Sequence, residues 1–330
     1  MTQQKIMSGV RRWRLPALIA GVVLVLVFVL FRAPNVEGLS SHPRPAQSYA
    51  EAAQRIAALQ AQESPAMNPV CRLRFMTHGQ KVERAIVFVH GYTNCPQQFD
   101  ELGRRFYALG YNVLIAPLPY HGLADRAAPE LARLTAEDLA AYADGAVDIA
   151  QGLGDHVTMA GVSAGGVVTA WAAQRRGDID LAVVMSPAFG VAAIPPPLTT
   201  PAVNVFLTLP DSFQWWDPAL KEQGGLPHAY AAYSTHALAQ IMRLGLAAMA
   251  DARQAAPAAQ TILVVTNAGD TSINIPMVYQ VAADWRGHGA QLTTYEFEPG
   301  MQLDHDLIDP AQPKQRIDVV YPILVSLIAK

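Results

Sequence analysis

The chain has 330 residues, of which 51% are apolar and 15% charged, and its formal net charge is −3. This composition excludes a disordered polyelectrolyte, because the chain can bury enough apolar surface to offset its conformational entropy. It also argues against nucleic-acid binding, since no net positive field is available to displace phosphate counterions.

An uncharged apolar run covers residues 15–31 and lies between Arg14 and Arg32. At about 1.5 Å per helical residue it nearly spans a bilayer core of roughly 30 Å, so we expect a transmembrane anchor over residues 15–32. Residues 1–14 are basic and lack acidic side chains, which predicts a cytoplasmic N-terminus and an extracytoplasmic remainder. Two alternatives stay open: a cleaved signal peptide, which would give a secreted protein, and a buried helix.

Export would change the interpretation of the charges and the cysteines. Residues 1–32 hold five of the 24 basic residues and none of the 27 acidic ones, so the remainder has a net charge of −8. Cys71 and Cys95 are too few for a disulfide scaffold or a four-thiolate zinc site. In an oxidising compartment they can pair with each other, and we expect this disulfide, whereas in the cytosol they would be free and buried.

Residues 33–69 are predicted to connect the apolar run to the main domain. The first part, residues 33–46, is rich in proline and short polar residues and is typical of a linker. Ser48 and Glu51 then have the spacing of a capping box, so a short helix should follow. In residues 70–76, apolar and basic side chains alternate as in a strand with one exposed face.

Short, continuous apolar runs begin at residue 85 and alternate with helical patterns. Such runs are typical of parallel strands that are buried on both faces, and their alternation with helices predicts a doubly wound α/β sheet. Pro96 suits the first position of one helix, and Thr135 can cap another. The predicted strands are 85–89, 113–116, 157–162, 181–185, 261–265 and 292–297.

Residues 190–257 interrupt this alternation. They show no clear strand pattern, but contain a proline-rich run, two adjacent tryptophans and a helical pattern over residues 234–250. An insertion of this size predicts a helical cap over the carboxyl ends of the strands, where ligands bind in open α/β sheets. The alternative is a pair of ordinary crossover helices.

Residues 161–165 read GVSAG, a G-x-S-x-G motif between an apolar strand and a helical pattern. So sharp a reversal strains the serine backbone, tolerates little bulk on either side, and exposes the hydroxyl at a helix N-terminus. We therefore predict that Ser163 is a nucleophile rather than a turn residue without chemistry. A serine nucleophile needs an oriented base, and we predict His305 as this base and Asp270 as its acid, both in loops after late strands.

Asp304 and Asp306 flank His305 and remain alternative acids, and either loop could instead be purely structural. A tetrahedral oxyanion needs backbone N–H donors, which we expect from Ala164 and Tyr92. His90, in the same loop as Tyr92, is expected to pack beneath the site rather than to act as a base. His121 fits a role in loop packing as well as one in the pocket. The candidate pocket residues are His121, Trp215 and Trp216.

Together these motifs resemble the α/β-hydrolase superfamily, especially bacterial carboxylesterases and the monoacylglycerol lipase and serine aminopeptidase group. The segments HGYTNCPQQF, GVSAGG, AGDTSIN and LDHDLID are similar to that group's motifs and follow the expected order over roughly residues 70–330. The resemblance implies an α/β-hydrolase fold, hydrolysis through an acyl-enzyme, and neither a metal nor an organic cofactor.

We therefore predict a membrane-anchored serine hydrolase whose catalytic domain covers residues 70–330 and lies outside the cytoplasm. The apolar cap and the anchor favour acyl or lipid-like esters as small-molecule substrates. Three other functions stay open. One is a serine aminopeptidase, in which Glu222 or Asp211 would have to bind the substrate ammonium group; the others are an acyltransferase and a non-catalytic binding module on the same fold.

Overall fold

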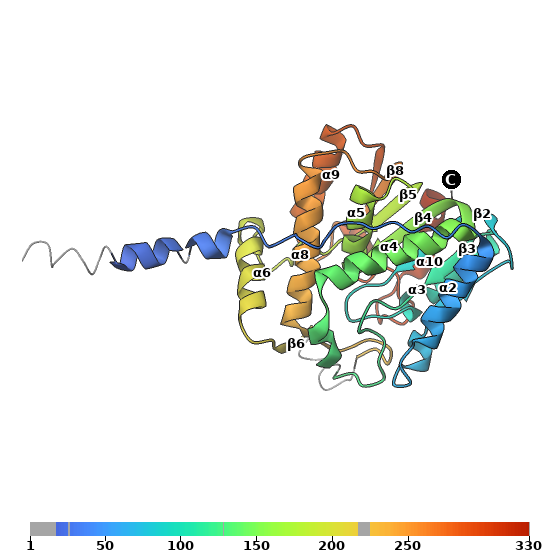
Figure 1. Cartoon of the computed structure of the whole chain (residues 1–330), viewed down its shortest axis with the longest axis horizontal. Helices are drawn as coiled ribbons and strands as arrows, with labels where there is room; N and C mark the ends of the chain where they lie inside the picture. The colour runs from blue at the N-terminus through green and yellow to red at the C-terminus, as the bar shows by residue number, and fades with distance from the viewer. Residues whose placement is uncertain (1–17, 26, 128, 217–224, 330) are drawn as a thin grey trace, which may run out of the picture.

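The structure is a computed structural model that describes residues 18–25, 27–127, 129–216 and 225–329. Within these residues a seven-stranded sheet has the order β1-β3-β2-β4-β5-β8-β9, and all neighbours are parallel except β1 and β3 (Figure 1). This is the mostly parallel sheet that the apolar runs predicted. Its strands are β1 (Arg74–Met76), β2 (Val82–Val89), β3 (Asn112–Ile115), β4 (Gly154–Val162), β5 (Leu181–Met185), β8 (Thr261–Asn267) and β9 (Leu292–Phe297).

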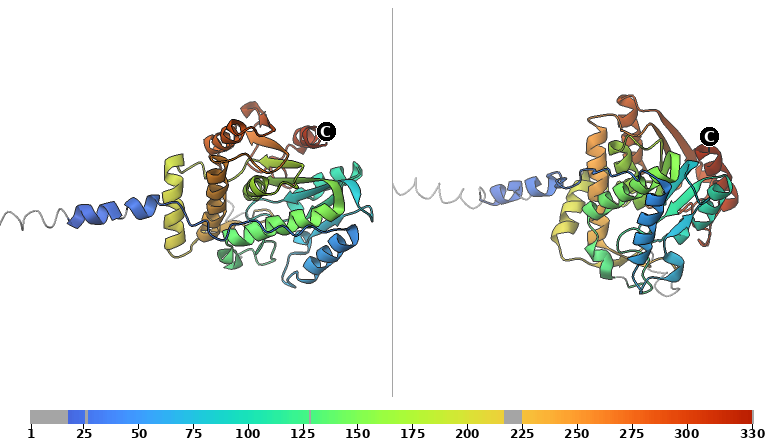
Figure 2. Two further views of the ribbon diagram at one scale, coloured as in Figure 1. Left: turned by 45° about the horizontal axis from the view of Figure 1, so that its top comes forward. Right: turned by 45° about the vertical axis from the view of Figure 1, so that its right-hand side comes forward.

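Helices cover both faces of the sheet (Figure 2). Along β2, Val87 and Val89 belong to one apolar core and Ile86 and Phe88 to the other, as expected for a strand buried on both faces. The helices of the first core are α2 (Tyr49–Ala61), α4 (Ala136–Leu153), α5 (Ala164–Arg175), α8 (Thr235–Ala252) and α9 (Ile275–Gly287). Those of the second core are α3 (Gln97–Ala108) and α10 (Ile317–Ile328). Short 3-10 helices are η1 (Pro69–Cys71), η2 (Pro129–Arg133), η3 (Pro196–Leu198) and η4 (Pro299–Met301).

Capping side chains fix several helix starts where the sequence predicts them. The Ser48 hydroxyl accepts the Glu51 N–H at the start of α2, and Thr135 forms a capping box at the start of α4. The prediction of a strand over residues 70–76 was wrong at its start, because η1 occupies residues 69–71. Pro69 presets the first turn of η1, and the side-chain oxygen of Asn68 accepts the Val70 N–H at 3.3 Å.

The segment predicted as a linker, residues 33–46, is docked on α4. The Ser41 hydroxyl donates to Asp144 at 2.5 Å, and the Arg44 N–H donates to Asp148 at 2.8 Å. Leu39 is also buried. The segment is therefore part of the domain, because carboxylates on α4 bind its polar groups.

The insertion between β5 and β8 lies where the sequence predicts a cap, but it is not wholly helical. It contains α6 (Thr199–Thr208) and an antiparallel pair formed by β6 (Phe213–Trp215) and β7 (Ala232–Ser234). Strands of three residues are too short to show an alternating pattern, so the sequence analysis missed them. The long helix α8 begins and ends close to its predicted bounds, but it packs against α4, α5 and α9 as a crossover helix would.

The apolar N-terminal run is helical over residues 18–25 and 27–31 and projects from the domain beside α6 (Figures 1 and 2). Its large apolar side chains are mostly exposed. The Asn204 amide on α6 donates to the carbonyls of Leu30, at 2.7 Å, and Arg32, at 2.9 Å. Residues 1–17 and 26, and with them the predicted cytoplasmic segment, lie outside the described residues. None of the described helices combines the length and the apolar character needed to cross a membrane.

Candidate active site

Ser163 lies on the turn from β4 into α5 and has a strained backbone, with φ of 57° and ψ of −115°. The glycines on either side of it cannot be replaced without displacing backbone. A Cβ on Gly161 would lie 2.1 Å from the Gly165 carbonyl oxygen, and one on Gly165 would lie 2.0 Å from that of Val89. The motif thus reflects close packing of the turn against β2, which holds the serine at the carboxyl edge of the sheet.

Asp270 and His305 form a close pair in loops that follow β8 and β9. His305 Nδ1 lies 2.6 Å from Asp270 Oδ2, within hydrogen-bond distance, and the Asp270 side chain is fully buried. The other oxygen of Asp270 accepts the Ser272 N–H at 2.8 Å, which fixes the carboxylate plane. With Nδ1 donating to Asp270, Nε2 is left to accept a proton. Ser163 and His305 line the same cavity, whose volume is about 820 Å³.

The electrostatics of this pair favour a basic imidazole. Burial is the largest effect on His305 and lowers its pKa, but the hydrogen bond and charge of Asp270, together with the charge of Asp306, outweigh it. The pKa of His305 is therefore raised above its ordinary value. A proton taken from Ser163 would be stabilised on the ring by the same contacts.

Asn267, the last residue of β8, connects the acid turn to the histidine loop and was not singled out in the sequence. Its amide donates to the carbonyls of Leu303, at 2.9 Å, and Asp304, at 3.2 Å. Its side-chain oxygen accepts the Gly269 N–H at 3.0 Å, and the residue is almost completely buried. One signal in the sequence could have pointed to Asn267: it ends a buried strand just before the predicted acid, Asp270.

The loop after β2 supplies the predicted oxyanion donor Tyr92. Its backbone N–H donates to no acceptor within the described part of the chain, and Tyr92 lines the same cavity as Ser163. Ala164 is the first residue of α5, where an N–H has no intrahelical partner. Gln98 supports the loop by accepting the Gly91 N–H at 2.8 Å.

His90 lies beneath this loop, as the sequence analysis proposed. Its Nδ1 is 2.8 Å from the Gly91 carbonyl and its Nε2 accepts the Leu118 N–H at 2.9 Å, so the ring is neutral with the proton on Nδ1. Burial, with the nearby His121 ring, lowers its pKa well below the ordinary value. Both ring nitrogens are engaged, so His90 has no free nitrogen for catalysis.

Cys71 and Cys95 form a disulfide that connects η1 to the end of the Tyr92 loop, with Cα atoms 5.2 Å apart. Both residues are fully buried. The covalent link joins a segment before the sheet to the loop that carries the predicted oxyanion donor. It therefore restrains this loop in addition to the hydrogen bond from Gly91 to Gln98.

The structure separates the three candidate pocket residues. Trp216 lines the cavity, stacks on Tyr233 at 4.1 Å and donates from its indole N–H to the Thr93 hydroxyl at 2.9 Å. Trp215 is 38% exposed and does not line the cavity. His121 does not line it either; the residue is buried, and its ring packs edge to face on that of Tyr92, with centroids 5.6 Å apart. These two placements correct the sequence-based expectation.

The other acidic candidates have structural partners. Asp304 pairs with Lys314 at 3.7 Å, and Asp306 accepts from Asn94 at 3.2 Å, so neither replaces Asp270 as the partner of His305. Asp211 supports the start of α8 by accepting from the hydroxyls of Ser234 and Thr235 and from the His236 N–H. Glu222 lies outside the described residues. In the part of the chain that the structure describes, no cluster of His, Cys, Asp and Glu is arranged to hold a metal ion.

Comparison with known proteins places the chain in a family. The family model described as serine aminopeptidase, S33, matches residues 80–271, more than half of the chain. The chain belongs to this hydrolase family. It is therefore a serine hydrolase, and the match contains Ser163 and Asp270 but ends before His305. A search of curated protein sequences found no match.

Solved structures share the fold of this hydrolase at low sequence identity. One, from a study of the metagenome-derived lipolytic enzymes LipS and LipT, is 19% identical with a TM-score of 0.59, covering 80% of this chain and 99% of its own. The monoacylglycerol lipase of Paleococcus ferrophilus is 17% identical, with a TM-score of 0.57 and coverage of 77% and 98%. A soluble variant of the monoglyceride lipase of Saccharomyces cerevisiae is 13% identical, with a TM-score of 0.55 and coverage of 78% and 89%.

Proposed function

We propose that this hydrolase cleaves carboxylic esters with acyl or lipid-like groups, using Ser163, His305 and Asp270 as its catalytic triad. The observation that carries the proposal is the 2.6 Å contact between His305 and Asp270 at a cavity that Ser163 also lines. The lipolytic enzymes and monoacylglycerol lipases that share the fold support an ester substrate.

The reaction follows from the arrangement of donors and acceptors. Ser163 Oγ attacks the ester carbonyl while His305 Nε2 takes its proton, and the backbone N–H groups of Tyr92 and Ala164 bind the oxyanion. Collapse of the tetrahedral intermediate breaks the ester bond, and His305 returns the proton to the departing alcohol. Water then attacks the acyl-enzyme carbonyl while His305 takes its proton. His305 returns this proton to Ser163 Oγ as the acid departs, which restores the enzyme.

The lining of the cavity supports an apolar acyl group. Val191, Leu238 and Ile241 line it together with Trp216, and its volume of about 820 Å³ is within the roughly 300–1,000 Å³ usual for ligand pockets. We therefore expect p-nitrophenyl esters of medium-chain acids to be hydrolysed faster than the acetate. Hydrolysis that survives Ser163→Ala would contradict the mechanism.

The family name makes an aminopeptidase the second candidate function. Such an enzyme needs a carboxylate to bind the substrate ammonium group, and Asp211 is instead engaged at the start of α8. Comparing ester turnover with the turnover of aminoacyl-β-naphthylamides decides between them, and faster amide cleavage would favour the peptidase. An acyltransferase would be favoured if an added alcohol outcompeted water for the acyl-enzyme.

We further propose that residues 15–32 anchor the enzyme in a membrane, with the catalytic domain outside the cytoplasm. The uncharged run, its basic flank and the exposed apolar side chains of residues 18–25 and 27–31 support this. The anchored protein should stay with membranes after alkaline carbonate extraction and be digested by external protease in spheroplasts. Release into the soluble fraction at full mass would contradict the anchor, and release without the first residues would indicate a cleaved signal.

A further inference from the structure

The turn that carries the predicted oxyanion donor, Tyr92, has a strained backbone at its third residue. The Asn94 N–H closes this turn by donating to the Gly91 carbonyl at 3.2 Å. The turn lies against the nucleophile, since a Cβ built on Gly91 would be 3.5 Å from that of Ser163. Its third residue, Thr93, has φ of 66°. Turns with a positive φ at this position favour glycine or asparagine, and a β-branched side chain is strained there, so other contacts must hold it.

The two ends of this turn are held by segments outside the cap. At the first residue, the Gly91 N–H donates to the Gln98 side chain at 2.8 Å. At the last, the Asn94 amide donates to the carboxylates of Asp306 and Asp309, both at 3.2 Å, in the histidine loop. These contacts fix where the turn begins and ends, but they do not involve its two central residues.

The centre of the turn is held by the cap, the insertion between β5 and β8. The Tyr92 hydroxyl donates to the Ser234 carbonyl and is accepted as a partner by the Ser234 N–H, both at 3.0 Å. The Thr93 carbonyl accepts the Tyr230 N–H at 2.8 Å, and the Thr93 hydroxyl accepts the Trp216 indole N–H at 2.9 Å. Within the described residues, the hydrogen bonds of these two central residues all go to the cap.

The indole contact accounts for a threonine where glycine would be less strained. A glycine would present the same carbonyl to Tyr230 without strain, but it has no hydroxyl to accept from Trp216. Thr93 is 6% exposed and lines the same cavity as Ser163 and Trp216. The cap therefore contacts the residue directly after the oxyanion donor, through both its backbone and its side chain.

We propose that Thr93 is a positioning residue through which the cap directs the Tyr92 N–H at the oxyanion. Trp216 and Tyr230 hold Thr93 in its strained conformation. Because both ends of the turn are fixed, relaxation of Thr93 to a negative φ must be compensated at Tyr92, whose N–H then no longer points at the reacting carbonyl. The inference rests on the proposed function, since the oxyanion forms only when Ser163 attacks a carbonyl. It adds that the cap stabilises the transition state as well as lining the pocket.

The test compares Thr93→Val, Thr93→Ser and Trp216→Phe in the full chain, with a medium-chain p-nitrophenyl ester as substrate. Valine keeps the β-branched shape and removes the hydroxyl, whereas serine keeps the hydroxyl. Phenylalanine keeps an aromatic ring and removes the indole donor. Because the same contact is deleted from both sides, the proposal stays testable if thermal melts show that one of the variants does not fold.

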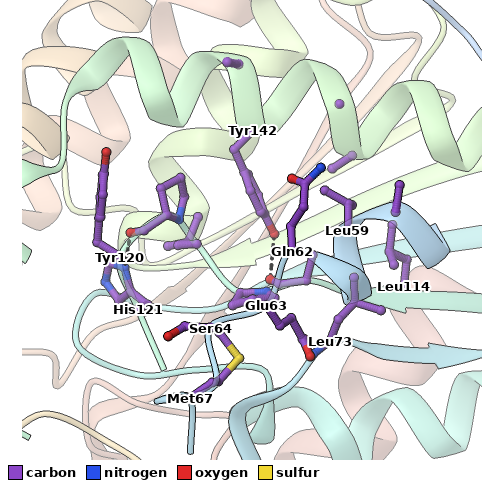
Figure 3. A pocket seen from close by; sticks show the side chains of 18 of the residues that line it. Leu59, Gln62, Glu63, Ser64, Met67, Leu73, Leu114, Tyr120, His121 and Tyr142 are labelled. Carbon is purple, nitrogen blue, oxygen red and sulfur yellow. Dashed lines mark hydrogen bonds between the residues drawn. The ribbon is translucent and has the colours of Figure 1, made fainter. Parts of the chain in front are cut away.

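Two controls distinguish positioning from the loss of any hydrogen bond. Thr199→Val removes a buried cap hydroxyl that donates to Met277 Sδ at 3.5 Å and does not line the Ser163 cavity. Tyr142→Phe removes a hydroxyl that donates to the Ala116 carbonyl at 2.9 Å in a second cavity, between α2 and α4 (Figure 3). None of the residues that line this second cavity lines the Ser163 cavity. Both controls should keep the wild-type kcat.

Removal of a whole oxyanion donor lowers kcat by about 10² to 10³, so its displacement should cost part of this. We expect kcat to be about tenfold lower in Thr93→Val and in Trp216→Phe, a loss of about 1.4 kcal/mol, with KM unchanged and no further loss in the double variant. Thr93→Ser should keep the wild-type kcat. An octyl trifluoromethyl ketone, whose tetrahedral adduct bears the same oxyanion, should bind both impaired variants about tenfold more weakly.

Three results would overturn the positioning role of Thr93. They are a kcat in Thr93→Val and Trp216→Phe equal to that of the controls, losses that add in the double variant, and a rise in KM alone. Equal losses in Thr93→Ser and Thr93→Val would contradict it as well. Failure of the proposed function is a different result, because Ser163→Ala would then retain ester hydrolysis.

Discussion

Asn267→Ala should uncouple the histidine loop from the acid turn. The substitution removes two hydrogen bonds donated to the carbonyls of Leu303 and Asp304 and one accepted from Gly269. At about 1 kcal/mol net for each bond, the free energy of unfolding should fall by about 3 kcal/mol. His305 would also lose its tether, and a displacement of roughly 1 Å in a catalytic group can lower the rate about 100-fold. We expect this loss in kcat, with KM nearly unchanged because the apolar lining is intact.

Asn112→Ala is a matched control for this substitution. Asn112 is equally buried, donates to the carbonyls of Gln80 and Leu153, both at 2.8 Å, and accepts the His78 N–H at 2.9 Å. It is the first residue of β3 and lies at the amino ends of the parallel strands, whereas the candidate site lies at their carboxyl ends. It should therefore cost the same stability, measured by urea unfolding, without lowering kcat of ester hydrolysis. Equal kcat values for the two variants would refute the positioning role of Asn267.

Three further predictions concern the same site. Asp270→Asn should lower kcat by about 10³ to 10⁴ with little change in stability, because the amide would favour the wrong tautomer of His305; a loss below tenfold in steady-state assays would contradict this role. In the wild type, kcat/KM should fall as the pH is lowered, with a midpoint above the ordinary histidine pKa of about 6.5, because the contacts that raise the pKa of His305 keep its ring protonated to a higher pH. A midpoint below about 6.5 would contradict the assignment of His305 as the base. Replacing Cys71 and Cys95 by alanine should reduce the free energy of unfolding by about 3 kcal/mol, given the 24-residue separation; an unchanged urea midpoint under oxidising conditions would show that the two cysteines contribute no stability.

The sequence predicts the sheet, and it points to the residues of the proposed triad, because both leave local signals. Continuous apolar runs mark strands buried on two faces, and the strained turn at Ser163 requires glycines that can be recognised in the motif. The rest depends on contacts between distant segments. Docking of residues 33–46 on α4 requires Asp144 and Asp148 to face them, which no spacing in the sequence encodes.

The β6–β7 pair and the directions of two candidate pocket side chains could not be predicted from the sequence either, because they too depend on contacts between distant segments. The β6–β7 pair has three residues in each strand, and its register is set by pairing rather than by an apolar pattern. His121 lies in a loop and Trp215 ends the three-residue strand β6, so the direction of each side chain depends on how the loop and the cap pack. Periodicity gave no information about either side chain.

Covalent labelling of Ser163 tests the central claim most directly. The full chain is treated with a fluorophosphonate, and the adduct is located by peptide mass spectrometry in the wild type, in Ser163→Ala and in Ser272→Ala, whose serine lines the same cavity. The account predicts one adduct, on Ser163, that is lost only in Ser163→Ala together with ester hydrolysis. An adduct on another residue, or hydrolysis that persists in Ser163→Ala, would contradict it.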